Sequence, residues 1–190
     1  MFFAYILAGV LVFWLIAKHM NKQRNHEKAV EKVSGRLKKI CGKPGEVLKN
    51  ATLNLPEGKM TFDAVLMDKR GVYLVRTYGW GIKIYGTPDG AMWRREDAKR
   101  KEEFENPLLE LKKGAAEITK VMEENGVQSL KVMPMVVFAD NFQTPELYLG
   151  YGSFSTTYQE LKNWYKKQSG VKEVQYDYDK VSSIIKELAK

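Results

Sequence analysis

The spacing of hydrophobic and polar positions changes several times along the chain, and each change marks a predicted element. Residues 1–17 (MFFAYILAGVLVFWLIA) are a continuous apolar run without a charged side chain. Over residues 25–41, apolar side chains recur every three or four positions between charged ones, which predicts an amphipathic helix. Two glycines and a proline in residues 42–45 end this helix.

Short β-rich segments follow, separated by turn residues. They predict strands over residues 47–55, 60–67, 71–78, 82–85 and 91–94. This close succession of four or five strands predicts an antiparallel meander. Residues 96–105 are so highly charged that we expect a solvated segment there.

Helices and strands alternate in the second half. Asn106 and Pro107 supply an N-cap and a first-turn proline, which predicts a helix ending at Gly126. The most apolar run of the domain, residues 132–139, predicts a strand buried on both faces and parallel to a neighbour. The remaining expected elements are a short strand over 146–149, a helix from a capping box at Thr156 and Gln159 to Ser169, and a last helix over 179–190.

These elements predict an α/β fold with a mixed sheet, in which an antiparallel meander is joined by a parallel strand after a helical crossover. Helices flank the sheet, and one transmembrane helix precedes it. The expected organisation is a membrane anchor over 1–20, a basic juxtamembrane helix over 21–45 that packs on the domain, and an α/β domain over 46–190.

The first 17 residues would span about 25 Å as a helix, slightly less than the roughly 30 Å hydrocarbon core. A cleaved signal peptide would carry its positive charges before the apolar run, whereas Lys18, Lys22 and Arg24 follow it. The positive-inside rule then predicts a single-pass protein of the cell membrane, with its N-terminus outside and its domain in the cytoplasm. A buried core helix is the alternative.

Positive charge is concentrated next to this run. The chain has a formal net charge of +8, and residues 18–50 hold ten Lys/Arg against three Glu. Such a band attracts anionic lipid headgroups, and nucleic acid would also accept it. The adjoining apolar run favours lipid. The predicted membrane-surface residues are Lys18, Lys22, Arg24, Lys28, Lys32, Arg36, Lys38 and Lys39.

Cysteine and histidine are scarce. The single cysteine, Cys41, cannot form an intrachain disulfide, and we expect it to be a small buried residue near a helix end. The two histidines are His19 and His26, so a histidine-dependent site in the domain would have to borrow one of them.

Several weak motifs occur in a recognisable order: a Glu-containing helix from Glu27, a strand carrying Asp63, a hairpin at Gly71, a Gly81-Ile82 strand, Trp93, an Asn106-Pro107-Leu108 helix start and a Val136-Val137-Phe138 strand. In this order they resemble the nuclease-related domain (NERD), a branch of the PD-(D/E)XK nuclease superfamily. The resemblance covers roughly 60% of the chain. It implies a restriction-endonuclease-like fold.

In active relatives, the Asp and a Glu-x-Lys on the next strand hold Mg²⁺ and activate water. The family spacing places that Glu and Lys thirteen and fifteen residues after Asp63, where this chain has Arg76 and Tyr78. An arginine there would repel a divalent cation and satisfy the carboxylate itself. The resemblance therefore implies a relic site without a metal or other cofactor. Alternatively, Glu96, Asp97 or Glu110 (in place of a family glutamine) restores a second carboxylate and with it a Mg²⁺-dependent nuclease.

The sequence leaves more than one explanation open for these and other polar and aromatic residues. Asp63 could lie on the solvent face of its strand, and Arg76 could bind phosphate instead of pairing with Asp63. Asp140 ends a buried strand, where ligands bind in open α/β sheets, but ordinary turn chemistry explains it better. Trp80, Lys83, Tyr85 and Trp93 are candidates for binding nucleic acid or a partner protein, although core and edge packing is the default explanation for the aromatic residues.

Three functions follow. The first is a membrane-tethered, catalytically inactive NERD-like domain that binds or scaffolds a protein or nucleic acid. The second is a Mg²⁺-dependent nuclease with a rearranged site. The third is a structural protein of the membrane surface whose basic helix binds anionic lipid.

Overall fold

The computed structural model describes residues 5, 7, 9–15, 26–140, 143–168 and 176–190. The elements, in chain order, are α2 (His26–Cys41), β1 (Glu46–Leu55), β2 (Gly58–Asp68), β3 (Gly71–Tyr78), β4 (Lys83–Gly86), β5 (Met92–Glu96), β6 (Lys101–Glu105), α3 (Pro107–Glu124), β7 (Val132–Phe138), β8 (Glu146–Leu149), β9 (Ser155–Thr157), α4 (Leu161–Gln168) and α5 (Tyr178–Leu188).

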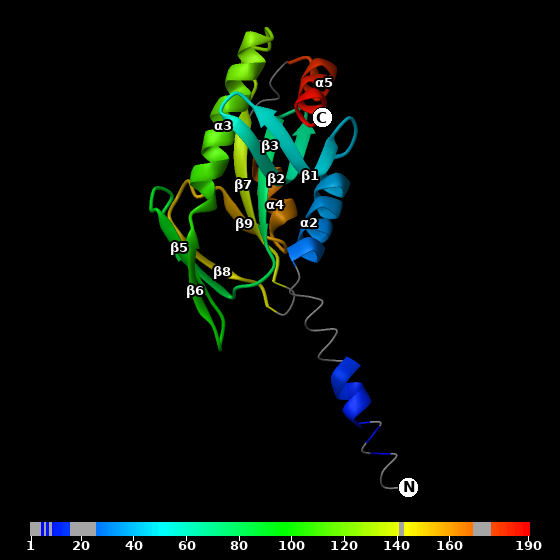
Figure 1. Ribbon diagram of the computed structural model, residues 1–190, viewed down its shortest axis with the longest axis vertical. Coiled ribbons are helices and arrows are strands. Elements are labelled where there is room, and N and C mark those ends of the chain that lie inside the picture. Colours follow the sequence, from blue (N-terminus) through cyan, green and yellow to red (C-terminus); the bar gives the residue numbers. More distant parts are fainter. Residues whose placement is uncertain (1–4, 6, 8, 16–25, 141–142, 169–175) are drawn as a thin grey trace.

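The larger sheet has the strand order β1-β2-β3-β7-β9 and carries helices on both faces (Figure 1). Strands β1, β2 and β3 are antiparallel, whereas β7 runs parallel to both β3 and β9. Helix α3 makes the crossover from the smaller sheet to β7. The predicted mixed sheet, with a parallel strand after a helical crossover, is confirmed.

Two apolar clusters hold the helices on this sheet. Helices α2 and α4 pack on one face, where Val33, Leu37 and Leu161 meet Leu66 and Tyr73. Helices α3 and α5 pack on the other face through a second set of side chains. This set includes Leu111, Ile118, Met122, Val181 and Ile185. Both faces of the sheet are covered, which agrees with the strongly apolar sequence of β7.

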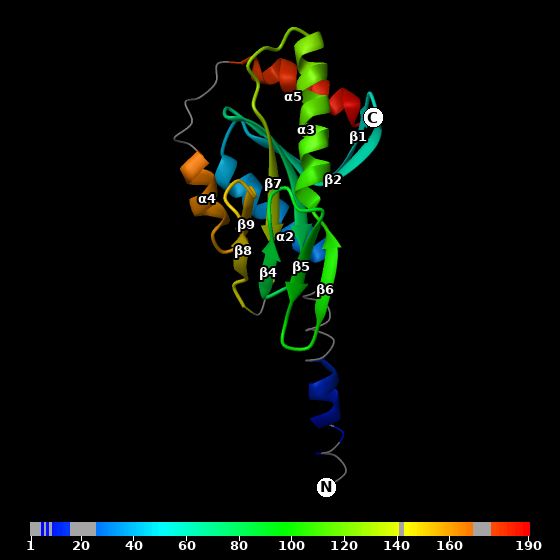
Figure 2. The same ribbon diagram turned by 90° about the vertical axis from the view of Figure 1, so that its left-hand side faces the viewer.

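The prediction of one meander is wrong, because the strands divide between two sheets. A four-stranded sheet, β6-β5-β4-β8, lies below α3 in Figure 2. The chain leaves the larger sheet after Tyr78 and passes through Gly79, Trp80 and Gly81. Gly81 has a φ of 120°, which other residues rarely adopt, and this backbone lets β4 start a new sheet.

The charged segment 96–105 also differs from the expectation. Its second half forms the edge strand β6, antiparallel to β5. Phe104 supplies the inward side chain, and its ring lies 6.3 Å from that of Trp93. One apolar residue among charged ones gave too weak an alternation to predict a strand.

The expected capping box at Thr156 and Gln159 is wrong as well. Thr156 and Thr157 belong to β9, and Thr157 Oγ1 accepts a hydrogen bond from the Glu160 amide at 3.2 Å. Helix α4 therefore begins at Leu161, four residues after the first helical position that the motif indicated. The other helices begin and end within about two residues of their predicted limits.

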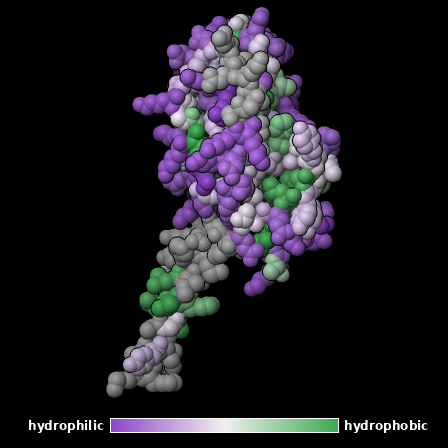
Figure 3. All heavy atoms as spheres, turned by 180° about the vertical axis from the view of Figure 1, so that it is seen from behind, coloured by the Kyte–Doolittle hydropathy of each residue, from purple (hydrophilic) through white to green (hydrophobic). Residues whose placement is uncertain are grey.

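Most of the predicted anchor, including Lys18, and the basic residues Lys22 and Arg24 lie outside the described residues, as does His19. Residues 9–15 are helical, and the apolar side chains between Tyr5 and Leu15 that are described are at least half exposed. In Figure 3 this segment is mainly green, whereas the face of the domain seen there is largely purple. Among the described residues, no helix has the length and apolar character needed to cross a membrane.

Candidate functional site

The site predicted from the family spacing lies where β2 and β3 separate. Backbone pairing between these strands ends at Ala64 and Val75, one residue before Asp63 and Arg76. The Asp63 carboxylate replaces the missing pairing, because its Oδ2 accepts a hydrogen bond from the Thr77 amide at 2.6 Å. Asp63 is 5% exposed, so it does not lie on a solvent-facing strand surface.

Arg76 joins this carboxylate to a second one. Its Nη1 lies 3.7 Å from Asp63 Oδ1, and its Nη2 lies 2.7 Å from Glu110 Oε2. Nη2 also donates to the Thr61 carbonyl at 3.0 Å. The guanidinium therefore sits between acidic groups from β2 and α3, as the ion-pair interpretation of Arg76 requires.

His26 is a further member of the site. It is the first residue of α2, and its Nε2 lies 3.3 Å from Asp63 Oδ1. The side chain is 59% exposed and covers one side of an almost buried carboxylate. The sequence identified His26 only as one of two available histidines, and no motif linked it to Asp63.

The first turn of α3 places Glu110. Asn106 caps this helix by accepting a hydrogen bond from the Leu108 amide at 3.0 Å. Its Nδ2 also donates to three carbonyls of the β4–β5 turn, those of Thr87, Pro88 and Gly90. One buried side chain thus fixes the helix start to the smaller sheet and holds Glu110 over the larger one.

The other carboxylates considered from the sequence have partners elsewhere. Glu96 lies 3.8 Å from Arg94 Nε, and Asp97 lies 3.2 Å from Arg100 Nη2. Glu110 approaches the relic site from α3, but through Arg76. In the part of the chain that the structure describes, no group of three or more His, Cys, Asp or Glu side chains is arranged to hold a metal ion.

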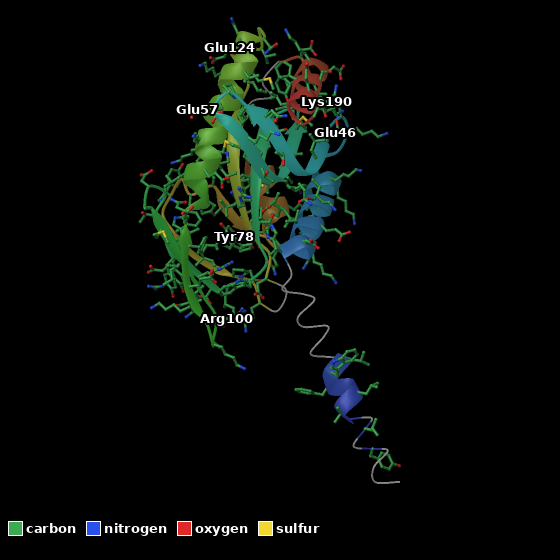
Figure 4. The ribbon with its side chains drawn as sticks, in the orientation of Figure 1. Glu46, Glu57, Tyr78, Arg100, Glu124 and Lys190 are labelled. Atoms are coloured by element: carbon green, nitrogen blue, oxygen red, sulfur yellow. The ribbon has the colours of Figure 1, made fainter. Side chains whose placement is uncertain are left out.

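Tyr78 occupies the position of the family lysine. Its ring stacks on Phe138 at 5.5 Å and lies 4.9 Å from Phe104, between the two sheets (Figure 4). Burial raises the pKa of Tyr78 to about 12, against the smaller lowering effect of Arg76 and Arg95. The phenol is therefore neutral at physiological pH and supplies no positive charge of the kind that the family lysine provides.

The four candidate binding residues are not equivalent. Trp93 is 1% exposed and donates from Nε1 to the Thr87 carbonyl at 2.8 Å, so it is a core residue and its prediction as a binding residue was wrong. Gly86 makes room for it, since a Cβ there would lie 2.3 Å from Trp93 Cδ1. Lys83 is exposed on β4.

Arginine side chains contact the two remaining aromatic candidates. The guanidinium carbons of Arg95 and Arg100 lie 4.1 and 4.3 Å from the Trp80 ring centre. Tyr85 stacks on Tyr148 at 4.9 Å, and the Arg94 guanidinium lies 4.5 Å from the Tyr85 ring. Trp80 and Tyr85 are half-buried, so part of each remains at the surface.

Asp140 has the geometry of a turn residue. It follows β7, is 1% exposed, and its Oδ1 accepts a hydrogen bond from the Gln143 amide at 3.3 Å. Cys41 is half-buried at the end of α2, which is less burial than the sequence indicated.

The mixed sheet, its helical layers and an acidic residue at the separation of β2 and β3 characterise this α/β domain. The sequence profile of the nuclease-related domain (NERD) matches residues 22–139, which is more than half of the chain. The chain therefore belongs to the NERD family. The matched residues include His26, Asp63, Arg76 and Glu110.

An uncharacterized protein of Bacillus anthracis is 33% identical over 110 residues. The alignment covers 56% of this chain and 51% of that protein, so the chain spans about half the length of this relative. No solved structure matches the chain.

Proposed function

We propose that this protein is a NERD domain without a divalent-metal site, which binds or scaffolds a protein or nucleic acid at the cytoplasmic face of the cell membrane. The observation that carries the proposal is the position of Arg76 between the Asp63 and Glu110 carboxylates. In this arrangement the domain keeps the family fold and uses the former catalytic position for an internal ion pair.

The electrostatics oppose a bound divalent cation. Mg²⁺ requires near-octahedral oxygen ligands at about 2.0–2.1 Å. Asp63 Oδ2 already accepts the Thr77 amide, and its Oδ1 faces both Arg76 and His26. A cation at this carboxylate would meet the positive charge of Arg76 at close range, where like charges repel strongly.

Membrane attachment is supported by the apolar run and by the basic band that follows it. The described side chains of residues 5–15 are apolar and exposed, which is unfavourable for a helix left in water. On α2, Lys28, Lys38 and Lys39 are exposed, and each could gain roughly 1 kcal/mol from an anionic membrane surface. Lys32 and Arg36 are half-buried against the Tyr158 ring, at 4.3 and 4.6 Å.

A nuclease assay tests the loss of activity. The full-length chain, purified in mild detergent, is incubated with DNA and with RNA in the presence of Mg²⁺ or Mn²⁺, beside an Asp63→Ala variant. We expect no cleavage above that of the variant. Cleavage that disappears in Asp63→Ala would overturn the proposal.

Glu110 favours the alternative of an active nuclease with a rearranged site. Its carboxylate is separated from that of Asp63 only by the Arg76 guanidinium, which contacts both. That activity requires Arg76 to leave the space between them. The remaining alternative is a structural protein that binds anionic lipid through α2. It predicts vesicle binding with neither cleavage nor a metal-dependent rise in melting temperature, and with no protein or nucleic-acid partner.

A further inference from the structure

A second polar site lies at the other end of the larger sheet. A hollow of about 220 Å³ opens between the end of α2, the following turn, the β2–β3 turn and α4. Its lining side chains include Lys43, Asp68, Lys69, Arg70 and Tyr165. The hollow is smaller than the roughly 300–1,000 Å³ typical of drug-sized ligand pockets, so its size fits one compact polar group.

Three of these side chains are cationic. Lys43 and Lys69 are exposed, and Arg70 is half-buried. Across the described ranges, none of the three forms an ion pair with a carboxylate. Glu46, which follows Gly45 of the hollow, forms an ion pair with α5 and not with these cations, since its Oε2 lies 2.7 Å from Lys186 Nζ. Three cations therefore line the hollow, and none has an ion-pair partner among the described residues.

Arg70 is held in place while part of its guanidinium stays available. Its Nη1 donates to the Tyr165 carbonyl at 3.2 Å, and its guanidinium carbon lies 4.3 Å from the Tyr165 ring centre. A fixed guanidinium loses little freedom when it binds an oxyanion, and its planar fork suits two oxygens at once.

Among the described residues, Asp68 forms no ion pair with the three cations. It is 4% exposed, and its Oδ1 accepts a hydrogen bond from the Arg70 amide at 2.9 Å. Its Oδ2 accepts a hydrogen bond from the Tyr165 hydroxyl, and its backbone carbonyl accepts one from Tyr176. These contacts fasten α4 and the chain before α5 to the β2–β3 turn, so the carboxylate already serves the fold.

The other acidic groups of the hollow stay neutral. Burial, reinforced by the negative charge of Asp68, raises the pKa of the Cys41 thiol. Burial and the hydrogen bond to Asp68 also raise the pKa of the Tyr165 phenol. At physiological pH the hollow thus holds three positive charges against one negative charge that is hydrogen-bonded within the fold.

We propose that Lys43, Lys69 and Arg70 form a binding site for a phosphate group carried by a soluble ligand. The positive surplus, the fixed guanidinium and the compact volume match a tetrahedral dianion better than a larger ligand. Two exposed ammonium groups and one positioned guanidinium supply N–H donors that suit phosphate oxygens.

This site is separate from the ion-pair site and does not depend on the proposed function. Helix α2 runs from His26, beside Asp63, to Cys41 at the hollow, and 15 residue steps along a helix extend about 22 Å. In Figure 4, Glu46 and Tyr78 mark the two ends of the sheet concerned.

Calorimetric titration with inorganic phosphate tests this site on the full-length chain in mild detergent, with chloride at matched ionic strength as the comparison. We expect saturable one-to-one binding of phosphate. A Lys43→Gln/Lys69→Gln variant should bind at least about tenfold more weakly, because the loss of either of its two charge-assisted contacts alone is worth about that factor. A Lys101→Gln/Lys120→Gln variant removes the same charge from β6 and α3 and should bind like the wild type.

Vesicles containing phosphatidic acid distinguish a lipid phosphate from a soluble one. We expect the Lys43→Gln/Lys69→Gln variant to bind these vesicles like the wild type. The proposal is overturned if chloride reproduces the phosphate signal, if both double variants bind phosphate equally, or if the Lys43→Gln/Lys69→Gln variant loses its binding to the vesicles.

Discussion

Arg76 has an unusual combination of partners for one side chain. It contacts a buried carboxylate on β2, an exposed carboxylate on α3 and the Thr61 carbonyl. Of these acceptors, only the Asp63 carboxylate is buried, so it is the one that water could not easily satisfy if the guanidinium moved out. In a buried or half-buried setting, the loss of such a partner costs much more than the loss of a surface ion pair.

Replacing Arg76 should therefore reveal its structural role. We expect Arg76→Met to lower the free energy of unfolding by about 2 kcal/mol, because Asp63 keeps its charge and loses its main cation. Arg94→Met is the matched control, since the Arg94–Glu96 pair is more exposed and 3.8 Å long, and it should cost less than about 1 kcal/mol. Urea titration measures both, and equal losses would contradict the role given to Arg76.

Tyr78 gives a pH-dependent prediction. Its pKa is about 12 in the folded domain against an ordinary value of 10.0, so above pH 10 the unfolded chain loses this proton more readily than the folded one. The free energy of unfolding should consequently fall as pH rises from about 10 to about 12. In Tyr78→Phe this fall should be less steep. Tyr151→Phe, at a fully exposed position, should retain the wild-type slope in urea titrations over this pH range.

At the scale of the elements, the start of α3 decides how the two sheets meet. Asn106 satisfies the Leu108 amide of the helix and three carbonyls of the β4–β5 turn. It is 3% exposed, so water cannot easily take over these contacts. The same residue determines where the first turn of α3, and with it Glu110, lies over the sheet.

We expect Asn106→Ala to destabilise the domain by about 2–3 kcal/mol, which combines the loss of a helix cap with buried carbonyls left unpaired. Asn125→Ala removes one side-chain hydrogen bond at the exposed end of the same helix and should cost less than about 1 kcal/mol. Thermal and urea unfolding compare the two variants. A smaller loss at Asn106 than at Asn125 would contradict this account.

The regular spacing of apolar residues predicted most helices and strands correctly. How these elements are arranged depended on single residues, whose role cannot be recognised from the sequence around them. The heptad-like spacing of α2 and the apolar run of β7 were sufficient to place both elements. The break between the sheets at Gly81, the edge strand β6 and the start of α4 after Thr157 were not predicted. Each of these depends on backbone conformation or on contacts with distant segments.

In the candidate site, too, some residues could be identified from the sequence and others could not. Asp63, Arg76 and Glu110 could be identified because the family spacing gives each a defined place, and the expected Asp63–Arg76 contact is present. His26 could not be identified, since its approach to Asp63 depends on how α2 packs across the sheet. Trp93 was misassigned because a buried and an exposed aromatic residue look alike on a short strand.

At the scale of the whole molecule, residues 140–190 lie beyond the matched family region, and the described helices among them, α4 and α5, pack on its core. Tyr165 and Tyr176 reach Asp68, Arg36 donates to the Gln159 carbonyl, and Lys186 pairs with Glu46. The described part of this segment is thus joined to both faces of the larger sheet. We regard it as part of one folding unit with the NERD region.

Membrane attachment can be tested on intact cells. We expect the full-length chain to sediment with membranes and to resist extraction by alkaline carbonate, as a single-pass protein does. Val12→Arg places a charge within the apolar run and should make the chain extractable, at a cost of roughly 2.5–3.5 kcal/mol for a charge at the membrane centre. A Val12→Leu variant controls for the substitution itself. Full extraction of the wild-type chain would contradict the anchor.

We expect the basic face of α2 to give the chain a preference for anionic lipid, while the apolar N-terminal run attaches it to the membrane. A Lys38→Glu/Lys39→Glu variant should lose its preference for anionic over neutral vesicles, since each reversed charge removes an attraction of roughly 1 kcal/mol. Its sedimentation with cell membranes should stay unchanged. Vesicle flotation at low and high salt measures the preference, and an unaltered preference would exclude these lysines from lipid binding.

Calorimetric titration of the full-length chain with Mn²⁺ tests most directly whether Arg76 has replaced the metal. We expect no saturable binding to the wild type, and a one-to-one site in Arg76→Glu, where two carboxylates would face each other across the separation of β2 and β3. Saturable one-to-one binding of Mn²⁺ to the wild type, lost in Asp63→Ala, would contradict the account.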